Sequence, residues 1–365
     1  MIDEKILNNV ELAIFKLRSL YNAYGYSQYK MSKFEEYDYY VKNKDFLISD
    51  RIITFTDTNG KLLALKPDVT LSIIKQVSES NSVQKLYYNE NVYRVSGESH
   101  KFKEIMQTGL ECVGKIGIYE ICEVTALAIK SLECIDENYQ LDISHAGFVQ
   151  ALLKEQGFEK ETEEKVSEYI SAKNSGGINK LLEKGEINET QAKIANALIV
   201  NYKNCAQVLE AVGEVGQEAK NAFDEFCRVL DCIGDLGKSE NVNINFSLAN
   251  NMSYYSGIVF KGYIQGIPTG VLSGGQYDKL MKKLKKDASA VGFAVYLDGF
   301  ERHKLSNPEF DADVVLIKDA SVSSAEILKT VEELSKNGES VLVLDKADSK
   351  IKSRRTVDAL GREIK

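Results

Sequence analysis

The sequence has no excess of basic residues and no cysteine spacing typical of a zinc site. Its 365 residues carry a formal net charge of −8, which argues against stable, nonspecific nucleic-acid binding because neutralising phosphates requires a basic face. The six cysteines form no C-x-x-C pair, and the three histidines are widely scattered. We therefore predict no metal site and no cofactor, and we expect the cysteines to be free buried thiols in a reducing cytosol.

Long apolar runs and a secretory signal are also missing. No stretch approaches the roughly 18 apolar residues of a membrane span, and the first five residues lack a basic segment followed by an apolar one. The hydrophobic fraction of 44% and the charged fraction of 27% are those of an ordinary globular protein with a sizeable core. We expect a cytoplasmic protein that does not associate with membranes. Lysine-rich stretches at residues 282–286 and 350–355 are interpreted as solvated faces.

The periodicity of the first 147 residues predicts helices alternating with paired strands. Apolar spacing over residues 3–24 predicts a helix that Gly25 ends. An Asn59-Gly60 turn between two alternating stretches predicts a hairpin over residues 51–65, and a helix should begin near Val69, after Pro67. Further elements follow in the order strand, strand, helix, strand, at residues 85–95, 104–115, 119–132 and 139–143.

The middle of the chain differs in character from its two ends. Residues 148–237 are rich in Glu, Lys and Ala, with helical periodicity broken at Gly176-Gly177 and around Gly213 to Gly216. Strand patterns resume at residues 243–248, 254–263 and 269–272, and a lysine-rich helix follows Asp278. Beyond Asn307-Pro308, a strand, a helix and a second strand form a short tail.

These patterns predict an α+β fold, an antiparallel sheet flanked by helices. Residues 1–147 and 238–306 form the main domain, residues 148–237 a helical insertion, and residues 307–365 a small C-terminal α/β domain.

Candidate ligand-binding residues cluster in two segments. Asp68 and Thr70 lie two apart in a stretch read as extended, so both would face one ammonium group. Gln107 and Glu111 lie four apart on one predicted strand and also share a face. The planar fork of Arg94 suits a carboxylate or a phosphate. Singly, each has an ordinary alternative, since an Asp after Pro is most often a turn residue or helix cap and a Gln or Glu on a strand is usually solvated.

Together, these segments resemble histidyl-tRNA synthetases in order and spacing. Residues 65–70 (LKPDVT) are similar to the Leu-Arg-Pro-Glu-Gly-Thr element of that family, and residues 92–94 and 107–114 to the second class II signature motif in its histidyl form. Residues 254–260 and 274–278 match two further histidyl elements, and residues 292–294 open the third motif. The resemblance covers about residues 1–300 and implies a class II synthetase-like fold. It places a histidine pocket at Asp68, Thr70, Gln107, Glu111 and Tyr255, to which we add Arg94 and Tyr254.

The departures from the family pattern fall on groups that handle the triphosphate. The catalytic arginine of the family aligns with Asn250 and its neighbouring Asp with Ser253. The Glu-Arg pair of the third motif aligns with Asp298 and Gly299. One preorganised donor is worth roughly 3–4 kcal/mol in the transition state, so losing two guanidinium groups argues against adenylation. We predict no catalytic residue. Gln276 also replaces an arginine, and Ser32 stands where motif one has its proline.

A synthetase-like chain with its histidine pocket kept and its arginines lost resembles the regulatory subunits of ATP phosphoribosyltransferase. The resemblance implies a non-catalytic protein that forms a hetero-oligomer with a short catalytic subunit in the first step of histidine biosynthesis and transmits feedback inhibition by histidine. It also implies self-association through a synthetase-type dimer interface. The C-terminal tail is short for an anticodon-binding domain of about 100 residues. Two alternatives stay open: a divergent histidyl-tRNA synthetase, or a stand-alone histidine-binding paralogue.

Overall fold

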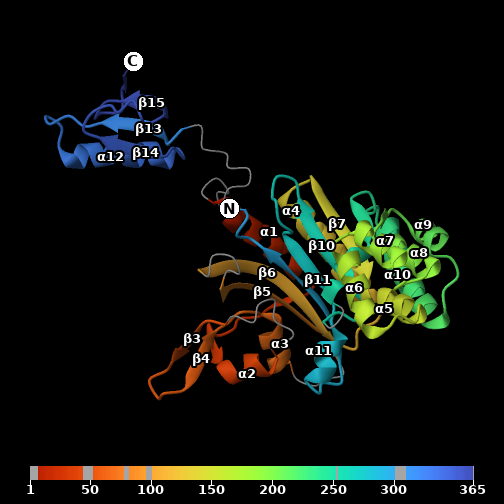
Figure 1. Cartoon of the computed structure of the whole chain (residues 1–365). Coiled ribbons are helices and arrows are strands. Elements are labelled where there is room, and N and C mark those ends of the chain that lie inside the picture. The colour runs from red at the N-terminus through yellow and green to blue at the C-terminus, as the bar shows by residue number, and fades with distance from the viewer. Residues whose placement is uncertain are drawn as a thin grey trace. The chain divides into compact units, whose positions relative to one another are not determined.

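The computed structural model describes residues 7–43, 52–77, 82–95, 101–251, 254–300 and 310–364, without the side chains of residues 249–251. The chain divides into two compact units, Met1–His303 and Lys304–Lys365. Figure 1 shows the first as a strongly twisted sheet with helices around it.

A large mixed sheet organises the first unit. Within the described residues it has nine strands in the order β1-β5-β6-β12-β11-β10-β7-β9-β8. Neighbouring strands are antiparallel except for β1 beside β5 and β7 beside β9. The strands are β1 (Ser27–Gln28), β5 (Gln84–Val95), β6 (Phe102–Gly114), β7 (Tyr139–His145), β8 (Asn201–Tyr202), β9 (Val242–Asn245), β10 (Ile258–Ile264), β11 (Leu272–Gln276) and β12 (Ser289–Tyr296). The predicted α+β class with a largely antiparallel sheet is confirmed.

Helices α1 (Asn9–Ala23) and α4 (Ile118–Ile135) pack on one face of this sheet. Fully buried Leu17 and Tyr21 of α1 meet the apolar side of α4, and the hydroxyls of Tyr21 and Ser131 lie 3.0 Å apart. Helix α1 begins later than residue 3, because the side chain of Asn8 accepts the Glu11 amide in a capping box that fixes the first turn. The other sheet face carries Gln107 and Glu111.

The helical insertion follows β7 and returns to the sheet at β9. Its helices are α5 (Ala146–Glu155), α6 (Lys160–Ser171), α7 (Ser175–Glu183), α8 (Glu189–Ala197), α9 (Cys205–Val212) and α10 (Gln217–Asp235). The predicted break at Gly176-Gly177 is wrong, since both glycines lie inside α7. The chain turns earlier, where Lys173 adopts φ 50° and the Asn174 side chain accepts the Gly177 amide. The break at Gly213 is confirmed, with φ 77° after α9.

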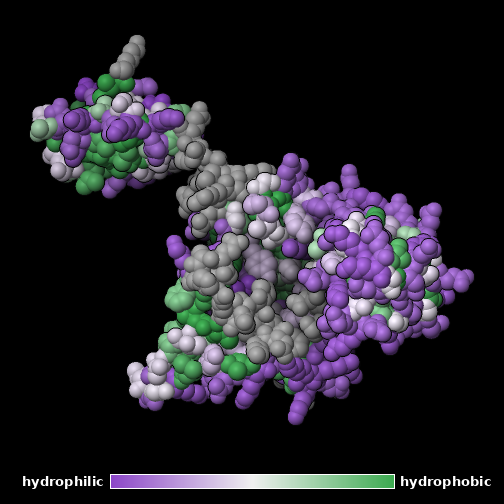
Figure 2. Space-filling view, viewed as in Figure 1, coloured by the Kyte–Doolittle hydropathy of each residue, from purple (hydrophilic) through white to green (hydrophobic). Residues whose placement is uncertain are grey.

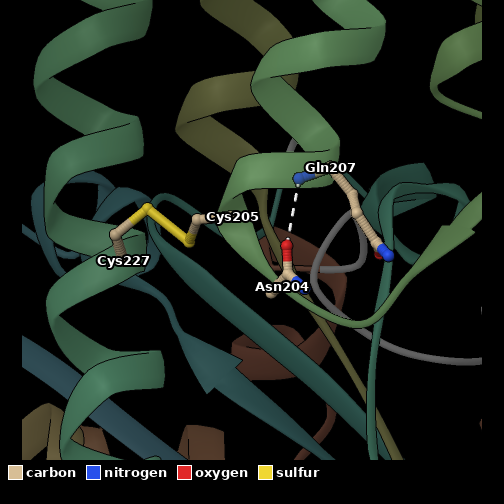
Figure 3. Close-up of a disulfide and its surroundings, with 4 residues drawn as sticks. All are labelled: Asn204, Cys205, Gln207 and Cys227. Carbon is tan, nitrogen blue, oxygen red and sulfur yellow. Dashed lines mark hydrogen bonds between the residues drawn. A yellow bond between two sulfur atoms is a disulfide. The ribbon is translucent and has the colours of Figure 1, made fainter.

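One disulfide links two helices of the insertion, which corrects the expectation of free thiols throughout. Figure 3 shows Cys205, the first residue of α9, bonded to Cys227 in α10, beside the Asn204 cap of α9. Their Cα atoms lie 6.2 Å apart, within the range that a disulfide spans. The two cysteines are 22 residues apart in the sequence. Cys112, Cys122, Cys134 and Cys232 are free.

A second core lies beside the sheet, around α3 (Thr70–Gln76), α11 (Asp278–Lys283) and α2 (Tyr37–Lys42). It includes a small sheet of β2 (Phe34–Glu36), β3 (Thr54–Thr56) and β4 (Leu62–Leu65). The predicted hairpin is confirmed by antiparallel β3 and β4, joined by a turn in which Gly60 adopts φ 80°. The helix expected near Val69 begins at Thr70.

Several strand boundaries differ from the prediction; the strand expected over residues 254–263, for example, begins only at Ile258. The strand expected over residues 243–248 ends at Asn245 and continues as a 3-10 helix, η3 (Phe246–Asn251), because the Asn245 side chain binds the Ser247 amide and hydroxyl and turns the chain. Residues 274–276, expected to lead into the helix, are still part of β11.

The C-terminal unit is a small α/β structure with its own core. Parallel strands β13 (Ala312–Ile317) and β14 (Val341–Leu344), joined through α12 (Ser324–Lys336), confirm the predicted strand–helix–strand pattern. Strands β15 (Ser353–Val357) and β16 (Glu363–Ile364) extend this sheet and were not predicted. Across the described parts of both units, no helix is long and apolar enough to cross a membrane.

Candidate functional site

A cavity of about 680 Å³ opens on the sheet face opposite α1 and α4. Its lining includes all seven residues predicted to bind histidine: Asp68, Thr70, Arg94, Gln107, Glu111, Tyr254 and Tyr255. They come from β5, β6, the start of α3 and the segment before β10. Residues separated by up to 187 positions (68 to 255) therefore face one space.

Glycines lie where strands β6, β12 and β11 cross the floor of the cavity. Glu111 pairs with Gly292, and Gly292 pairs with Gly275, across adjacent strands. A Cβ on Gly292 would overlap the Glu111 carboxylate, and one on Gly109 would overlap the Tyr88 hydroxyl. The glycines therefore leave room for the acidic side chain and for a ligand above the sheet.

Glu111 is the central polar group of the cavity, and only 1% of its surface is exposed. The Thr70 hydroxyl donates to its Oε1 at 2.6 Å, and the Tyr277 hydroxyl donates to its Oε2. Burial raises the pKa of Glu111 to about 8, against the lowering effect of these two hydrogen bonds and with a further rise from nearby Asp68. The carboxyl therefore holds its proton more strongly than an ordinary glutamate, and a cationic ligand would favour its charged form.

Asp68 both caps a helix and lines the cavity. Its carboxylate accepts the Leu71 amide at 2.9 Å, so the stretch is not extended, and Thr70 is already the first residue of α3. The predicted shared strand face is therefore wrong, although the first turn of the helix still brings both side chains to the cavity. Burial raises the pKa of Asp68, while the Leu71 amide and Arg94 oppose the shift.

Two donors complete the polar lining. The Nε of Arg94 donates to the Pro67 carbonyl at 3.0 Å, which holds the side chain at the wall of the cavity. Gln107 is 2% exposed, and its amide nitrogen has no hydrogen-bond partner among the described residues. A buried donor without a partner costs roughly 1–3 kcal/mol, so an acceptor on a ligand would be stabilised there.

Tyrosines form much of the wall, and the sequence indicated only two of them. The rings of Tyr254 and Tyr255 meet edge to face at 4.7 Å, and Tyr254 lies 5.8 Å from Tyr277. Burial raises the pKa of Tyr277 well above 10, so its hydroxyl stays a donor to Glu111. Tyr88, Tyr277 and Tyr296 were missed; Tyr277 belongs to the motif at residues 274–278, which was the available signal.

The positions where the family arginines are absent are only partly described. Gly299 is exposed, and Asp298 lines the cavity. Ser253 lies outside the described residues, as does the side chain of Asn250. The amide nitrogen of Gln276 donates to Asp278 at 2.8 Å, and Ser32 accepts the Phe34 amide in a turn. No group of three or more His, Cys, Asp or Glu within the described ranges is arranged to hold a metal ion.

Comparison with known proteins identifies the family. The family model described as histidyl-tRNA synthetase matches residues 3–300. The ATP phosphoribosyltransferase regulatory subunit of Clostridium kluyveri is 30% identical over 304 residues, which span 80% of this chain and 78% of that protein. The chain belongs to the histidyl-tRNA synthetase family, among its ATP phosphoribosyltransferase regulatory subunits. The regulatory subunit of Caldanaerobacter subterraneus is similar at 29% identity over 290 residues, covering 78% of this chain and 75% of the relative.

Solved structures share the fold of this regulatory-subunit family member. A protein of Bacillus halodurans, described as an ATP phosphoribosyltransferase regulatory subunit/histidyl-tRNA synthetase, matches with a TM-score of 0.77 at 24% identity, covering 96% of this chain and 93% of that one. A chain from the ATP phosphoribosyl transferase (HisG:HisZ) complex of Thermotoga maritima matches with a TM-score of 0.64 at 22% identity, covering 82% and 98%. The predicted class II synthetase-like fold is confirmed by these structures. The predicted role of the chain in histidine biosynthesis is confirmed by the regulatory subunits among its relatives.

Proposed function

We propose that this chain is a non-catalytic regulatory subunit that binds histidine and passes its feedback inhibition to a short ATP phosphoribosyltransferase catalytic subunit, which needs it for activity. The observation that carries the proposal is Glu111, buried in the cavity and held by Thr70 and Tyr277. A buried carboxyl with a pKa of about 8 favours a ligand that brings positive charge or a hydrogen-bond donor.

The lining matches the three polar groups of histidine. Asp68 and Thr70 suit the α-ammonium group, Glu111 and Tyr255 suit the imidazole, and the donors Arg94 and Gln107 suit the carboxylate. Tyr254 supplies an aromatic wall on which the ring can pack. The assignment gives acidic groups to the ammonium and imidazole and donors to the carboxylate, which supports histidine over a ligand of one charge sign.

Adenylation is not part of the proposal. Asn250 and Gly299 occupy the positions where the resemblance expects arginines, and among the described residues that line the cavity only Arg94 and Lys261 carry a positive charge. Since one lost donor costs roughly 3–4 kcal/mol in a transition state, the chain should lack histidine-dependent exchange of pyrophosphate into ATP.

The proposed assembly is a hetero-oligomer with the catalytic subunit, built on a dimer of this chain. The family supports the first part, and the Thermotoga maritima complex is named as one of HisG with HisZ. The dimer is what the resemblance to the synthetases implies. Feedback requires histidine to bind the active and inactive assemblies with different affinity.

Calorimetry with histidine tests the pocket. We expect binding by the wild type and loss of binding in Glu111→Ala, with weaker binding in Tyr255→Phe. Glu111→Gln keeps a hydrogen-bonding side chain but cannot give a proton to the imidazole, so it should bind histidine more weakly than wild type. Unchanged affinity in both Glu111 variants would exclude the assignment.

Two further assays separate the alternatives. Histidine-dependent ATP–pyrophosphate exchange by the purified chain would identify a divergent synthetase. Failure to stimulate a short catalytic subunit, with histidine binding intact, would leave a stand-alone histidine-binding paralogue. Stimulation that histidine reverses is the result we expect.

A further inference from the structure

Helix α10 carries two cysteines, and each of them lies against a different helix. Cys227 is bonded to Cys205 of α9, within the helical insertion (Figure 3). Cys232 lies beside Cys122 of α4, and the two thiols hydrogen-bond to each other. Because α4 packs on the large sheet, this second pair of cysteines connects the insertion to the helices that cover the sheet.

Helix α10 packs directly against α4. Its buried residues include Val229 and Ile233, whereas Figure 2 shows a mostly hydrophilic outer surface over the helices of the insertion. Just beyond the end of α10, the Lys238 ammonium donates to both carboxylate oxygens of Glu133, at 2.7 and 2.8 Å, and Glu133 lies in the last turn of α4. The two helices are therefore in contact at two places, the thiol pair and this ion pair.

The spacing of packed helices suits a disulfide between them. The axes of two helices in contact lie about 8–10 Å apart, and the Cα atoms lie about 2.3 Å from each axis. Residues that face each other across the contact therefore have Cα atoms about 3.5–5.5 Å apart, which overlaps the range of about 4.4–6.8 Å found in disulfides. The bond from α9 to the same helix has its Cα atoms 6.2 Å apart.

The environments of the free cysteines differ. Cys112 is buried and hydrogen-bonds to the Tyr26 hydroxyl, whereas Cys122 is buried against another thiol. Burial raises the pKa of Cys122, and the neighbouring Cys232 adds to the rise. Cys232 is only partly buried, so it is the thiol of the pair that an oxidant reaches first.

We propose that Cys122 and Cys232 form a redox-active pair, which a small disulfide such as oxidised glutathione converts into a bond that joins the helical insertion to α4. The Cys232 thiolate attacks one sulfur of the glutathione disulfide, whose S–S bond breaks and releases one glutathione thiolate. The Cys122 thiolate then attacks the Cys232 sulfur and releases the second. The two protein thiols supply two electrons, and their protons go to the two glutathione molecules. Neither cysteine lines the cavity, so this proposal stands apart from the proposed function.

Peptide mapping of the full chain tests the pair. The protein is reduced, equilibrated at increasing ratios of oxidised to reduced glutathione, alkylated and digested, and its peptides are identified by mass spectrometry. We expect a cross-linked pair of peptides, one containing Cys122 and the other Cys232. If Cys232 is a mixed disulfide with glutathione at every ratio, or is joined to a different cysteine, the proposal is overturned.

Single variants identify the partner of Cys232. In Cys122→Ala, Cys232 should stop at the mixed disulfide with glutathione, because the second thiol that would displace the glutathione is missing. The control is Cys134→Ala, which removes a free cysteine of α4 that is also partly buried. It should form the bond at a glutathione ratio within about twofold of wild type. A protein disulfide at Cys232 in Cys122→Ala, or loss of the bond in Cys134→Ala, would contradict the assignment.

Thermal unfolding tests whether the bond constrains the insertion. In the double variant Cys205→Ser, Cys227→Ser, which lacks the disulfide between α9 and α10, oxidation by glutathione should still raise the melting temperature by several degrees. The reason is that the new bond joins residues 110 positions apart (122 to 232) and so restricts the unfolded chain. Adding Cys232→Ser to this variant should abolish the rise. An equal rise with and without Cys232, or no rise in either protein, would overturn the constraint.

Discussion

At the scale of single residues, the stability of the protein depends on the protonation of Glu111. Its pKa is about 8 in the folded chain against an ordinary value of 4.5. Between these values the folded state binds more protons than the unfolded state, so this carboxyl lowers the free energy of unfolding as pH rises from about 4.5 to about 8. Binding a positively charged group of a ligand beside Glu111 would offset this loss of stability.

We therefore expect Glu111→Gln to become more stable relative to wild type as pH rises. The difference in unfolding free energy between the two proteins should grow by on the order of 3 kcal/mol from pH 5 to pH 8, because the glutamine has no proton to lose. Urea unfolding at several pH values, without histidine, measures it. Parallel stability curves for the two proteins would show that Glu111 titrates normally.

The glycine beneath Glu111 gives a second prediction. Gly292→Ala should displace the Glu111 carboxylate, abolish histidine binding and destabilise the fold by roughly 1–3 kcal/mol, the usual cost of overpacking. Its control, Ala294→Gly, lies on the same strand and faces the same cavity but adds no atoms, so histidine binding should persist. Calorimetry and thermal unfolding of both variants are the measurements. Histidine binding by Gly292→Ala would show that the floor has room to spare.

Because side chains alternate between the two faces of a strand, part of this site could be predicted from the sequence. Gln107 and Glu111 were placed on one face by their even spacing, and the structure has both in the cavity. Tyr277 could not be placed that way, because it reaches Glu111 only after β11 and β12 have paired and set it beside β6. Asp68 was misread for a local reason, since its carboxylate starts a helix where the proline suggested an extended chain.

At the scale of elements, helix ends decide where the chain turns. Gly234 lies in the last turn of α10, where a Cβ would meet nothing within 4 Å, and Gly237 follows the helix with φ 68°. The two glycines are chemically identical and three residues apart, yet only the second uses a conformation that other residues avoid.

Replacing each of these glycines with alanine should change the stability of the protein in opposite directions. Gly234→Ala should stabilise the protein by about 0.5–1 kcal/mol through helix propensity, whereas Gly237→Ala should destabilise it by about 1 kcal/mol because of the left-handed backbone. Chemical denaturation of the two variants tests this. A stabilising Gly237→Ala would mean that α10 ends differently in solution.

The same reasoning explains the misplaced elements. A glycine pair predicted a break at residues 176–177, but Asn174 caps α7 and tolerates glycine in its first turn, while Lys173 makes the turn that a glycine would usually make. Strand β15 escaped prediction because Arg354 and Arg355 read as a solvated basic run. In the structure they pair with Asp313 and Glu339 across the small sheet.

At the scale of the whole molecule, the two units have separate cores. Among the described residues, the C-terminal unit has a core of its own side chains, and the cavity is lined by residues between positions 68 and 298.

A chain ending at residue 303 should therefore keep the histidine affinity and main melting transition of the full protein, within about twofold and a few degrees. Calorimetry and thermal scans of the two proteins side by side provide the comparison. Loss of histidine binding on truncation would show that the C-terminal unit supports the cavity.

The short strand β8 has a consequence for solubility. Strand β9 has its outer edge paired by Asn201 and Tyr202, which the helical insertion supplies from more than 40 positions earlier in the chain. An unpaired edge strand is a template for strands of other molecules and so for aggregation. By covering Ile244 and Asn245, the insertion closes this edge of the sheet with only two residues of strand. Attempts to shorten the insertion should therefore retain β8, or the trimmed protein will expose β9 and associate edge to edge.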